Sequence, residues 1–423
     1  RCESILTGEG VRVMRENDRQ RINAQNLDFS RQGLRVLTFV YKKMGEKEIL
    51  TEKSESGYIF LGMTAMMDPP RPESKNAVLN ARRAGIRPVM ITGDHKITAA
   101  AIAEKIGILN EGGIAVSGPE LDDMADEELD RNLERINVYA RVSPEHKIRI
   151  VSAWQRKGHI VAMTGDGVND APALKKADIG VAMGKMGTEV SKDAASMILT
   201  DDNFATIIKA VANGRNVYRN IRNAIKFLLS GNMAGILSVL YTSLMALPTP
   251  FAPVHLLFIN LVTDSLPAIA IGMEKAEPGL LAKKPRNPKE GILTKRFILQ
   301  ILLQGALIAV CTMTAYHTGL ATGSEAAAST MAFSTLTLAR LFHGFNCRSS
   351  HSIFKIGLMS NLYSIMAFEA GVVLLAAVLF VPGLQTLFSV ADLSVRQLLT
   401  IVIFAVVPTL VIQAFKTVRE SMR

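Results

Sequence analysis

The chain has 423 residues, of which 48% are hydrophobic, and a formal net charge of +10. This average conceals two halves, because residues 1 to about 220 have an ordinary charged composition and the remainder is strongly apolar. The three cysteines, Cys2, Cys311 and Cys347, are too scattered for a disulfide framework and show no zinc-site spacing.

A short apolar run at residues 88–92 is followed by a polar turn, Thr92-Gly93-Asp94. The next stretch, residues 97–106, has the composition of a helix. The pattern therefore predicts a strand, a tight turn and a helix. This is half of a phosphate-binding βαβ unit, because the unpaired N–H groups at a helix amino terminus attract anions.

Residues 141–147 contain a second candidate for phosphate chemistry. Ser143 and Pro144 predict the start of a helix, which places Lys147 about one turn into it. A fixed cation beside a phosphoryl group stabilises the charge that spreads in the transition state. The alternative is a solvated surface lysine.

The apolar run at residues 159–163 breaks into a glycine-containing loop that carries Asp166, Asn169 and Asp170. Ligands of open α/β sheets collect where strands end in this way. The two carboxylates offer hard oxygen ligands for Mg²⁺, and Asn169 can hydrogen-bond a phosphoryl oxygen. A turn that only caps the following helix is the alternative, which the full spacing of residues 163–174 makes less favourable.

Residues 163–174 closely resemble the signature of the phosphorylation domain in P-type cation-transporting ATPases, a branch of the haloacid dehalogenase superfamily. Residues 68–71, 92–94 and 141–147 resemble three further motifs of that family, in the same order. The resemblance implies that ATP and Mg²⁺ are cofactors. The implied cofactor-binding residues are Asp68, Arg71, Thr92, Gly93, Asp94, Arg141 and Lys147; the implied catalytic residues are Thr92, Gly93, Asp94, Lys147 and Asn169; and the implied Mg²⁺ ligands are Asp166 and Asp170.

P-type pumps form an aspartyl-phosphate on an Asp-Lys-Thr-Gly-Thr motif, which does not occur in this sequence, and the chain begins at Arg1 without a methionine. The resemblance therefore implies a C-terminal fragment that is inactive alone. The rest of the same pump would hold the nucleophilic Asp, the actuator domain, most of the nucleotide domain and four spanning helices. The implied segments are the end of the nucleotide-binding domain (1–57), the phosphorylation domain (58–203), a stalk helix (204–224) and the transmembrane domain (225–423).

The second half contains about six apolar stretches that can cross a bilayer, which takes roughly 20 helical residues. The predicted fold is thus an α/β haloacid-dehalogenase-like (Rossmann-like) domain followed by an all-α transmembrane bundle. The helix expected before the first stretch is basic and free of proline, so it could act as a rigid stalk or touch lipid headgroups. The stretches lie near residues 225–247, 252–273, 297–318, 328–346, 361–381 and 396–415.

The basic residues predict the orientation of these helices. The loops near 248–251 and 319–327 carry no Lys or Arg, whereas the loop at 274–296 is rich in them. The positive-inside rule places the rich loop, the chain's tail and the α/β domain in the cytoplasm. Topology therefore explains the positive charge, and no nucleic-acid partner is expected. The basic residues of the rich loop are Lys275, Lys283, Lys284, Arg286, Lys289, Lys295 and Arg296.

The second apolar stretch carries Asn260, Thr263 and Asp264, which a regular helix would place on one face. Pro267 has no N–H, so the carbonyl of Thr263 loses its helical partner. A carboxylate, an amide oxygen and a freed carbonyl are ligands for a hard cation, and an ionisable residue within a membrane helix indicates function. The alternative is that Asp264 caps a broken helix or pairs with Arg340.

These residues resemble the ion-binding helix of the calcium-transporting subfamily, and residues 230–235 resemble its partner helix, which implies Asn232 as a further ligand. The sequence departs from the two-site calcium pumps of the endoplasmic reticulum at two positions. Gly235 and Arg340 stand where those pumps have acidic residues. We therefore expect one Ca²⁺ per ATP, with the Arg340 guanidinium filling the vacated second site as a built-in cation.

The predicted function is the C-terminal part of an ATP-driven Ca²⁺ exporter, with proton counter-transport as a further hypothesis from the resemblance. The alternatives are a pump for Mn²⁺ or for Na⁺, K⁺ or H⁺, and a phosphatase-like domain tethered to the membrane without transport. The expected partners are Ca²⁺ and the lipid bilayer. A monomer in a bacterial plasma membrane is the expected state.

Overall fold

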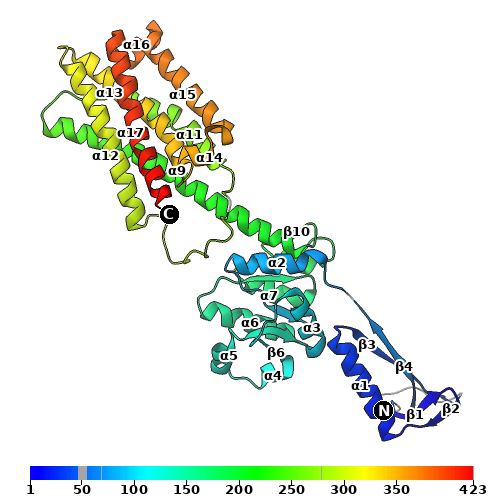
Figure 1. The fold of residues 1–423 in the computed structure, drawn as a ribbon. Coiled ribbons are helices and arrows are strands. Elements are labelled where there is room, and N and C mark those ends of the chain that lie inside the picture. Colours follow the sequence, from blue (N-terminus) through cyan, green and yellow to red (C-terminus); the bar gives the residue numbers. More distant parts are fainter. Residues whose placement is uncertain (46–54, 68, 278, 423) are drawn as a thin grey trace. The chain divides into compact units, whose positions relative to one another are not determined.

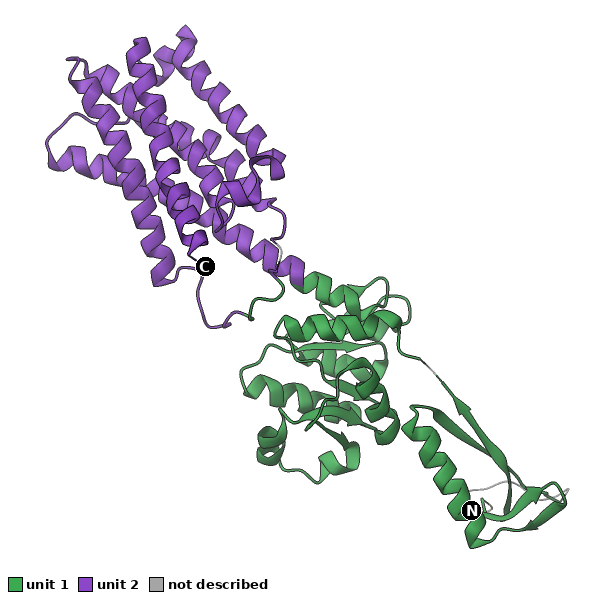
Figure 2. Ribbon diagram, in the orientation of Figure 1, with its two compact units in different colours: residues 1–211, 281–285 green, residues 212–280, 286–423 purple. Residues whose placement is uncertain are grey.

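The computed structural model describes residues 1–45, 55–67, 69–277 and 279–422. They divide into two compact units, residues 1–211 with 281–285 and residues 212–280 with 286–423 (Figure 2). The first unit mixes short strands with helices, whereas the second is entirely helical (Figure 1). This is the two-part architecture that the composition predicts.

The described residues of the first unit form three sheets. One is the four-stranded sheet β2-β1-β4-β3, and the others are the parallel three-stranded sheets β5-β7-β6 and β10-β9-β8. Its strands are β1 (Cys2–Thr7), β2 (Gly10–Val13), β3 (Arg35–Tyr41), β4 (Tyr58–Met66), β5 (Met90–Thr92), β6 (Ile114–Ser117), β7 (Ile136–Ala140), β8 (Ala162–Gly165), β9 (Ile179–Met183) and β10 (Met197–Leu199).

Helices alternate with these strands, which is the pattern of an α/β domain. The helices are α1 (Glu16–Arg31), α2 (Pro72–Arg83), α3 (Lys96–Ile106), α4 (Gly118–Asp122), α5 (Asp126–Asn132), α6 (Pro144–Arg156), η2 (Val168–Asp170), α7 (Ala171–Lys176) and α8 (Glu189–Ala194).

The expected elements form with small shifts at their ends. The helix predicted over 97–106 is α3, and α6 begins after Ser143, whose side chain accepts the N–H of His146. The strand predicted from Pro88 begins at Met90, since proline cannot donate to the sheet ladder. The strand predicted from His159 begins at Ala162, because the N–H of His159 bonds the carbonyl of Trp154 at the end of α6.

The second unit is a helical bundle. Its helices are α9 (Phe204–Leu244), which begins in the first unit, α10 (Pro253–Leu257), the π-helical η3 (Phe258–Thr263), α11 (Ser265–Gly272), α12 (Lys295–Leu320), α13 (Glu325–Cys347), α14 (Ile353–Ile356), η4 (Leu358–Ser360), α15 (Leu362–Phe380), α16 (Pro382–Phe388) and α17 (Val395–Ser421).

Among the described residues, five helical segments are long and apolar enough to cross a membrane: Phe204–Leu244, Pro253–Gly272, Lys295–Leu320, Leu362–Phe380 and Val395–Ser421. The sixth expected segment is α13, which is long enough but less apolar. It packs against α12, α15 and α17, and every residue from 330 to 341 is buried. A helix surrounded by other helices does not need the apolar surface that lipid contact requires, so α13 tolerates polar residues.

Candidate phosphate and cation sites

The Thr92-Gly93-Asp94 turn lies at the carboxyl end of β5. The Thr92 hydroxyl donates to the Asp94 carboxylate at 3.2 Å, and the Asp94 N–H donates back to the hydroxyl at 3.1 Å. The N–H of Arg141, at the end of the neighbouring strand β7, donates to the Asp94 carbonyl at 3.1 Å. Three residues that the sequence predicts for phosphate binding are therefore tied together at one sheet edge.

Asp170 organises the second motif. One of its carboxylate oxygens accepts the N–H groups of Asp166 and Gly167, both at 3.1 Å. The other oxygen pairs with the ammonium of Lys147 on α6. The side chains of Lys147 and Asp170 are 15% and 10% exposed, so water screens this pair little. The structure thus brings Lys147 to the magnesium motif, as the phosphate hypothesis requires.

Asp166 and Asn169 are exposed at the end of β8. Within the described residues, the Asp166 carboxylate makes no hydrogen bond or ion pair, so its oxygens can accept a ligand. Nowhere in the described ranges do three or more His, Cys, Asp or Glu side chains gather to hold a metal. Mg²⁺ prefers one or two carboxylates, with water and phosphate as its other ligands, so Asp166 beside Asp170 fits Mg²⁺ bound together with phosphate.

The two phosphate motifs end edge strands of separate sheets. β5 is at the edge of β5-β7-β6, and β8 is at the edge of β10-β9-β8. Ile91 of β5 packs against the apolar cluster that contains Met163 of β8, so the two edges are close. An unpaired strand edge offers N–H and carbonyl groups to another strand.

Arg35 is a cation at this site that the sequence did not indicate. Its guanidinium donates to the Asp94 carboxylate at 2.7 Å, although Arg35 lies 59 residues earlier in the chain. Of the two cofactor-binding residues predicted in the motif at residues 68–71, Asp68 lies outside the described residues. Arg71 is exposed, and its guanidinium donates to the carbonyl of Asp201 at 3.4 Å.

A buried ion pair stands at the centre of the second unit. The Arg340 guanidinium, on α13, bonds the Asp264 carboxylate, and the two side chains are 3% and 2% exposed. The same guanidinium nitrogen donates to the Asn232 side-chain carbonyl, on α9, at 2.9 Å. Two predicted cation ligands therefore converge on one resident cation. The alternative interpretation, in which Asp264 pairs with Arg340, describes the contact seen here.

Gly231 makes room for this guanidinium. A Cβ at position 231 would lie 2.8 Å or less from the guanidinium nitrogens of Arg340. Gly231 was not predicted as a site residue, because its role depends on the register between α9 and α13, which the sequence does not specify.

That the Arg340 guanidinium fills the vacated second site stays a prediction. Among the described residues, a Cβ at position 235 would have only Leu336, one helical turn before Arg340, within 4 Å. Leu336 fills that space with an apolar group. The guanidinium instead lies against Gly231, where Asn232 and Asp264 supply acceptor oxygens.

The segment that carries Asn260, Thr263 and Asp264 is not the regular α-helix that the prediction assumes. η3 is π-helical, and the N–H of Asp264 bonds the carbonyl five residues earlier, at Ile259. The Thr263 hydroxyl donates to the same carbonyl at 3.0 Å. Asp264 and Thr263 are buried, whereas Asn260 is exposed among the described residues. That the three residues act together as cation ligands stays a prediction.

Comparison with known families finds a match for each of the two parts of the chain. A family model described as "Cation transporting ATPase, C-terminus" matches residues 248–418, and one described as "haloacid dehalogenase-like hydrolase" matches residues 6–178. The chain belongs to the cation-transporting ATPase family. The two matches correspond to the α/β domain and the helical bundle that the sequence predicts.

Similar curated proteins are named calcium-transporting ATPases. One from Lactococcus lactis is 48% identical over 87% of this chain and 42% of its own length. Another from Listeria monocytogenes is 47% identical over 92% of this chain and 44% of its own length, and one from Bacillus subtilis is 44% identical over the same shares. The chain spans about half the length of these relatives.

Proposed function

We propose that this chain is the C-terminal part of an ATP-driven pump that exports one Ca²⁺ per ATP through an aspartyl-phosphate intermediate. The observation that carries the proposal is the buried Asp264, held with Asn232 and Arg340 at the centre of a bundle of apolar helices. The names of the similar proteins favour Ca²⁺ over the monovalent cations.

In this proposal the phosphate motifs act on a phosphorylated aspartate from elsewhere in the complete pump. The strand that carries this aspartate would pair with the open edges of β5 and β8, which places it between Thr92-Gly93-Asp94 and Asp166. Lys147 would neutralise the transferred phosphoryl group, and Arg35 and Arg141 would bind other phosphate oxygens of ATP. Mg²⁺, held by Asp166 and supported by Asp170, would shield the phosphate charges.

The Asp264–Arg340 pair is, in this proposal, the ion-free form of the transport site. An unpaired carboxylate in an apolar bundle is costly, so a resident guanidinium stabilises the site when no Ca²⁺ is bound. Ca²⁺ would replace Arg340 at Asp264 and Asn232, and the displaced guanidinium would then repel a second cation. This repulsion is the physical reason for a single ion per cycle.

The cytoplasmic location of the α/β domain and a bacterial plasma membrane remain part of this proposal. Proton counter-transport is also part of it, because Asp264 could carry a proton whenever Ca²⁺ and the guanidinium are both absent.

The decisive experiment is ⁴⁵Ca²⁺ uptake into sealed vesicles that contain the complete pump. Asp264→Asn should abolish ATP-dependent uptake, and the matched control Glu369→Gln, which changes an exposed acid on α15, should leave it intact. ATP consumption measured in the same vesicles should give a ratio near one Ca²⁺ per ATP. Uptake that survives in Asp264→Asn would refute the site.

Three further measurements distinguish the Ca²⁺ pump from a manganese pump and a tethered phosphatase, and test proton counter-transport. ⁵⁴Mn²⁺ uptake that exceeds ⁴⁵Ca²⁺ uptake at equal concentrations would favour a manganese pump. Phosphatase activity without uptake of either ion would favour the tethered phosphatase. A pH-sensitive dye inside the vesicles should report ATP-dependent alkalinisation, and its absence would refute proton counter-transport.

A further inference from the structure

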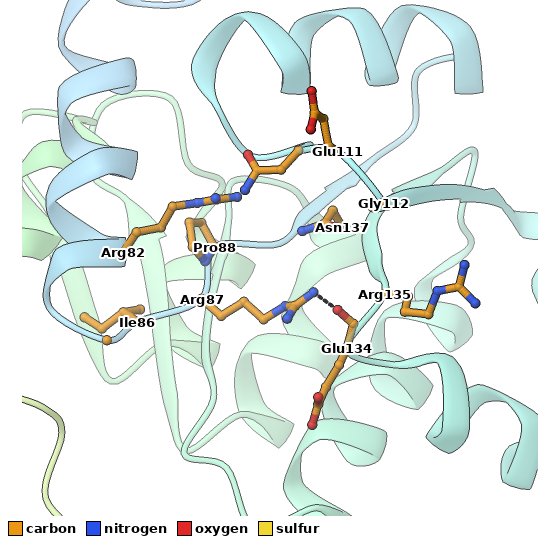
Figure 3. A pocket seen from close by; sticks show the side chains of 12 residues that line it. Arg82, Ile86, Arg87, Pro88, Glu111, Gly112, Glu134, Arg135 and Asn137 are labelled. Carbon is orange, nitrogen blue, oxygen red and sulfur yellow. Dashed lines mark hydrogen bonds between the residues drawn. The ribbon is translucent and has the colours of Figure 1, made fainter.

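The first unit contains a cleft of about 450 Å³ at the amino ends of the strands β5, β7 and β6 (Figure 3). Three short segments line it, each near the point where the chain enters one of these strands: residues 85–88, residues 110–113, and Glu134 and Arg135 with Asn137. Because the strands are parallel, all three entries lie at the same edge. The Thr92-Gly93-Asp94 turn and Arg141 lie at the opposite edge, so the cleft is distinct from the phosphate motifs.

Two arginines carry positive charge into the cleft. Arg82, on α2, donates from one terminal nitrogen to the carbonyl of Ile108 at 2.9 Å, while its Nε is buried without a partner among the described residues. Arg87 donates to the carbonyl of Glu134, and its guanidinium carbon lies 5.5 Å from the centre of the Trp154 ring. Neither guanidinium forms an ion pair with a carboxylate within the described parts of the chain.

The two positive charges are close enough to repel each other. Burial lowers the pKa of the Arg87 guanidinium, and Arg82 lowers it further, although Glu134 partly opposes this shift. Glu111 and Glu134 also line the cleft, but among the described residues neither carboxylate forms an ion pair with Arg82 or Arg87. Two like charges held together in this way favour an anion from outside.

Asn137 adds a directed hydrogen-bonding group. It is 7% exposed and lines the cleft, and the described residues supply no hydrogen-bond partner for its side-chain amide. Figure 3 shows Asn137 on the side of the cleft opposite the helix that carries Arg82, whereas the Arg135 side chain extends away from both. Gly113 is the residue that leaves space for this amide, because a Cβ there would overlap the Asn137 oxygen.

A further segment brings basic residues to the rim. Pro285 lies so close to Gly85 that a Cβ at position 85 would be 3.0 Å from the Pro285 Cγ. Lys283 and Lys284 precede this proline and are exposed.

We propose that this cleft binds a phosphate-bearing anion, with Arg82 and Arg87 as its charge partners and Asn137 as its hydrogen-bond donor. The planar guanidinium group matches the geometry of phosphate oxygens, and its fixed donors make short charge-assisted bonds. The cleft has the size of a small-molecule site, for which volumes of about 300–1,000 Å³ are common. The phosphate can belong to a free solute or to the headgroup of an anionic lipid.

The single tryptophan of this chain provides the readout, because Trp154 packs beneath Arg87. The complete 423-residue chain, in dodecyl maltoside micelles, is titrated with inorganic phosphate while the Trp154 emission is recorded. In a second arm, the micelles receive phosphatidylglycerol or, as the neutral comparison, phosphatidylcholine. A saturable change with phosphate identifies a free phosphate group as sufficient, and a change only with phosphatidylglycerol identifies the lipid headgroup.

The variants locate the site. Arg82→Gln should weaken binding by about tenfold or more, since it removes a charge-assisted contact. Arg83→Gln, an exposed neighbour on the same helix, should bind as the unmodified chain does. Lys147→Gln should also retain the signal, because Lys147 serves the phosphate motifs at the other edge.

Circular dichroism verifies the folding of each variant. Should Arg82→Gln not fold, Arg87→Gln replaces an exposed side chain, and its phosphate binding is measured by equilibrium dialysis because Trp154 itself senses this substitution. The proposal is overturned if neither phosphate nor phosphatidylglycerol gives a saturable response. It is equally overturned if Arg83→Gln loses as much affinity as Arg82→Gln, or if Lys147→Gln abolishes the response.

Discussion

The buried ion pair between Glu274 and Arg348 permits a quantitative prediction for the second unit. The Arg348 side chain is fully buried and that of Glu274 is 8% exposed. The guanidinium donates to both carboxylate oxygens, at 2.8 and 3.2 Å, and Asn361 donates to the same carboxylate at 2.8 Å. Arg348 also bonds Ser360 at 2.6 Å, so the pair fixes the segment after α11 to the loop before α15.

The perturbation is Glu274→Gln, which keeps the volume of the side chain but removes its charge. Charge centres about 4 Å apart, with an effective dielectric constant of about 20, interact by about 4 kcal/mol. Removing one partner of a buried pair destabilises proteins by about 3–5 kcal/mol, because the other charge stays buried. We therefore expect Glu274→Gln to lower the free energy of unfolding by about 3–5 kcal/mol.

The assay is unfolding by dodecyl sulfate in mixed micelles, followed by circular dichroism of the helical signal. The control Glu290→Gln changes an exposed glutamate of the same unit and should shift stability by no more than about 0.5 kcal/mol. The double variant Glu274→Met with Arg348→Met should be more stable than Arg348→Met alone, since it leaves no unpaired charge. A Glu274→Gln variant as stable as the control would refute this reasoning.

Two further predictions test packing and pH dependence. Gly371→Ala would place a methyl group 2.5 Å from a methyl carbon of the buried Leu341, so it should destabilise the bundle by about 1–3 kcal/mol. In contrast, a Cβ at Gly214 meets no atom within 4 Å, so Gly214→Ala should stabilise α9 by about 0.5–1 kcal/mol. Equal thermal unfolding midpoints for the two variants would contradict this prediction. The N–H groups of Lys185 and Met186 donate to the Asp202 carboxylate at 3.0 and 2.8 Å and hold its pKa below the ordinary value. Because the folded-state pKa is depressed, this stabilisation is complete above the unfolded pKa of about 3.9 and is lost as the pH falls through the folded value. The difference in melting temperature between the unmodified chain and Asp202→Asn should therefore be constant above about pH 5 and shrink below about pH 4, and a difference that stays constant below about pH 4 would contradict the assignment.

Local features of the fold were predictable where short-range chemistry decides them. Alternation of apolar runs with glycine turns located β5 and β8, and the Ser143-Pro144 pair located the start of α6. The absence of proline between residues 204 and 244 correctly predicted that the basic segment continues as one helix into the first apolar stretch. The strand ends were predicted less accurately, because single backbone hydrogen bonds decide them. The bond from the His159 N–H to the Trp154 carbonyl is one that a residue pattern does not specify.

Contacts between distant segments were not predictable from the sequence in this way. Arg35 reaches Asp94 across 59 residues, and no spacing rule links them. The π-helical turn at Phe258–Thr263 also has no signature in residue type, although it changes the backbone hydrogen bond of Asp264. Asp264 could be predicted as a candidate site residue from the sequence, because burying a carboxylate in an apolar helix costs free energy and therefore indicates a function.

The contacts around Arg340 show why substitutions at the proposed cation site have to be interpreted in pairs. Residues 231 and 235 lie one turn apart on α9, and residues 340 and 336 lie one turn apart on α13, so the observed contacts pair Gly231 with Arg340 and Gly235 with Leu336. A guanidinium fits beside Asp264 only because position 231 has no Cβ, whereas position 235 is in ordinary contact with a leucine. A resident cation in this bundle therefore depends on the combination of Gly231 and Arg340, and the loss of acidic residues at positions 235 and 340 would not create it alone.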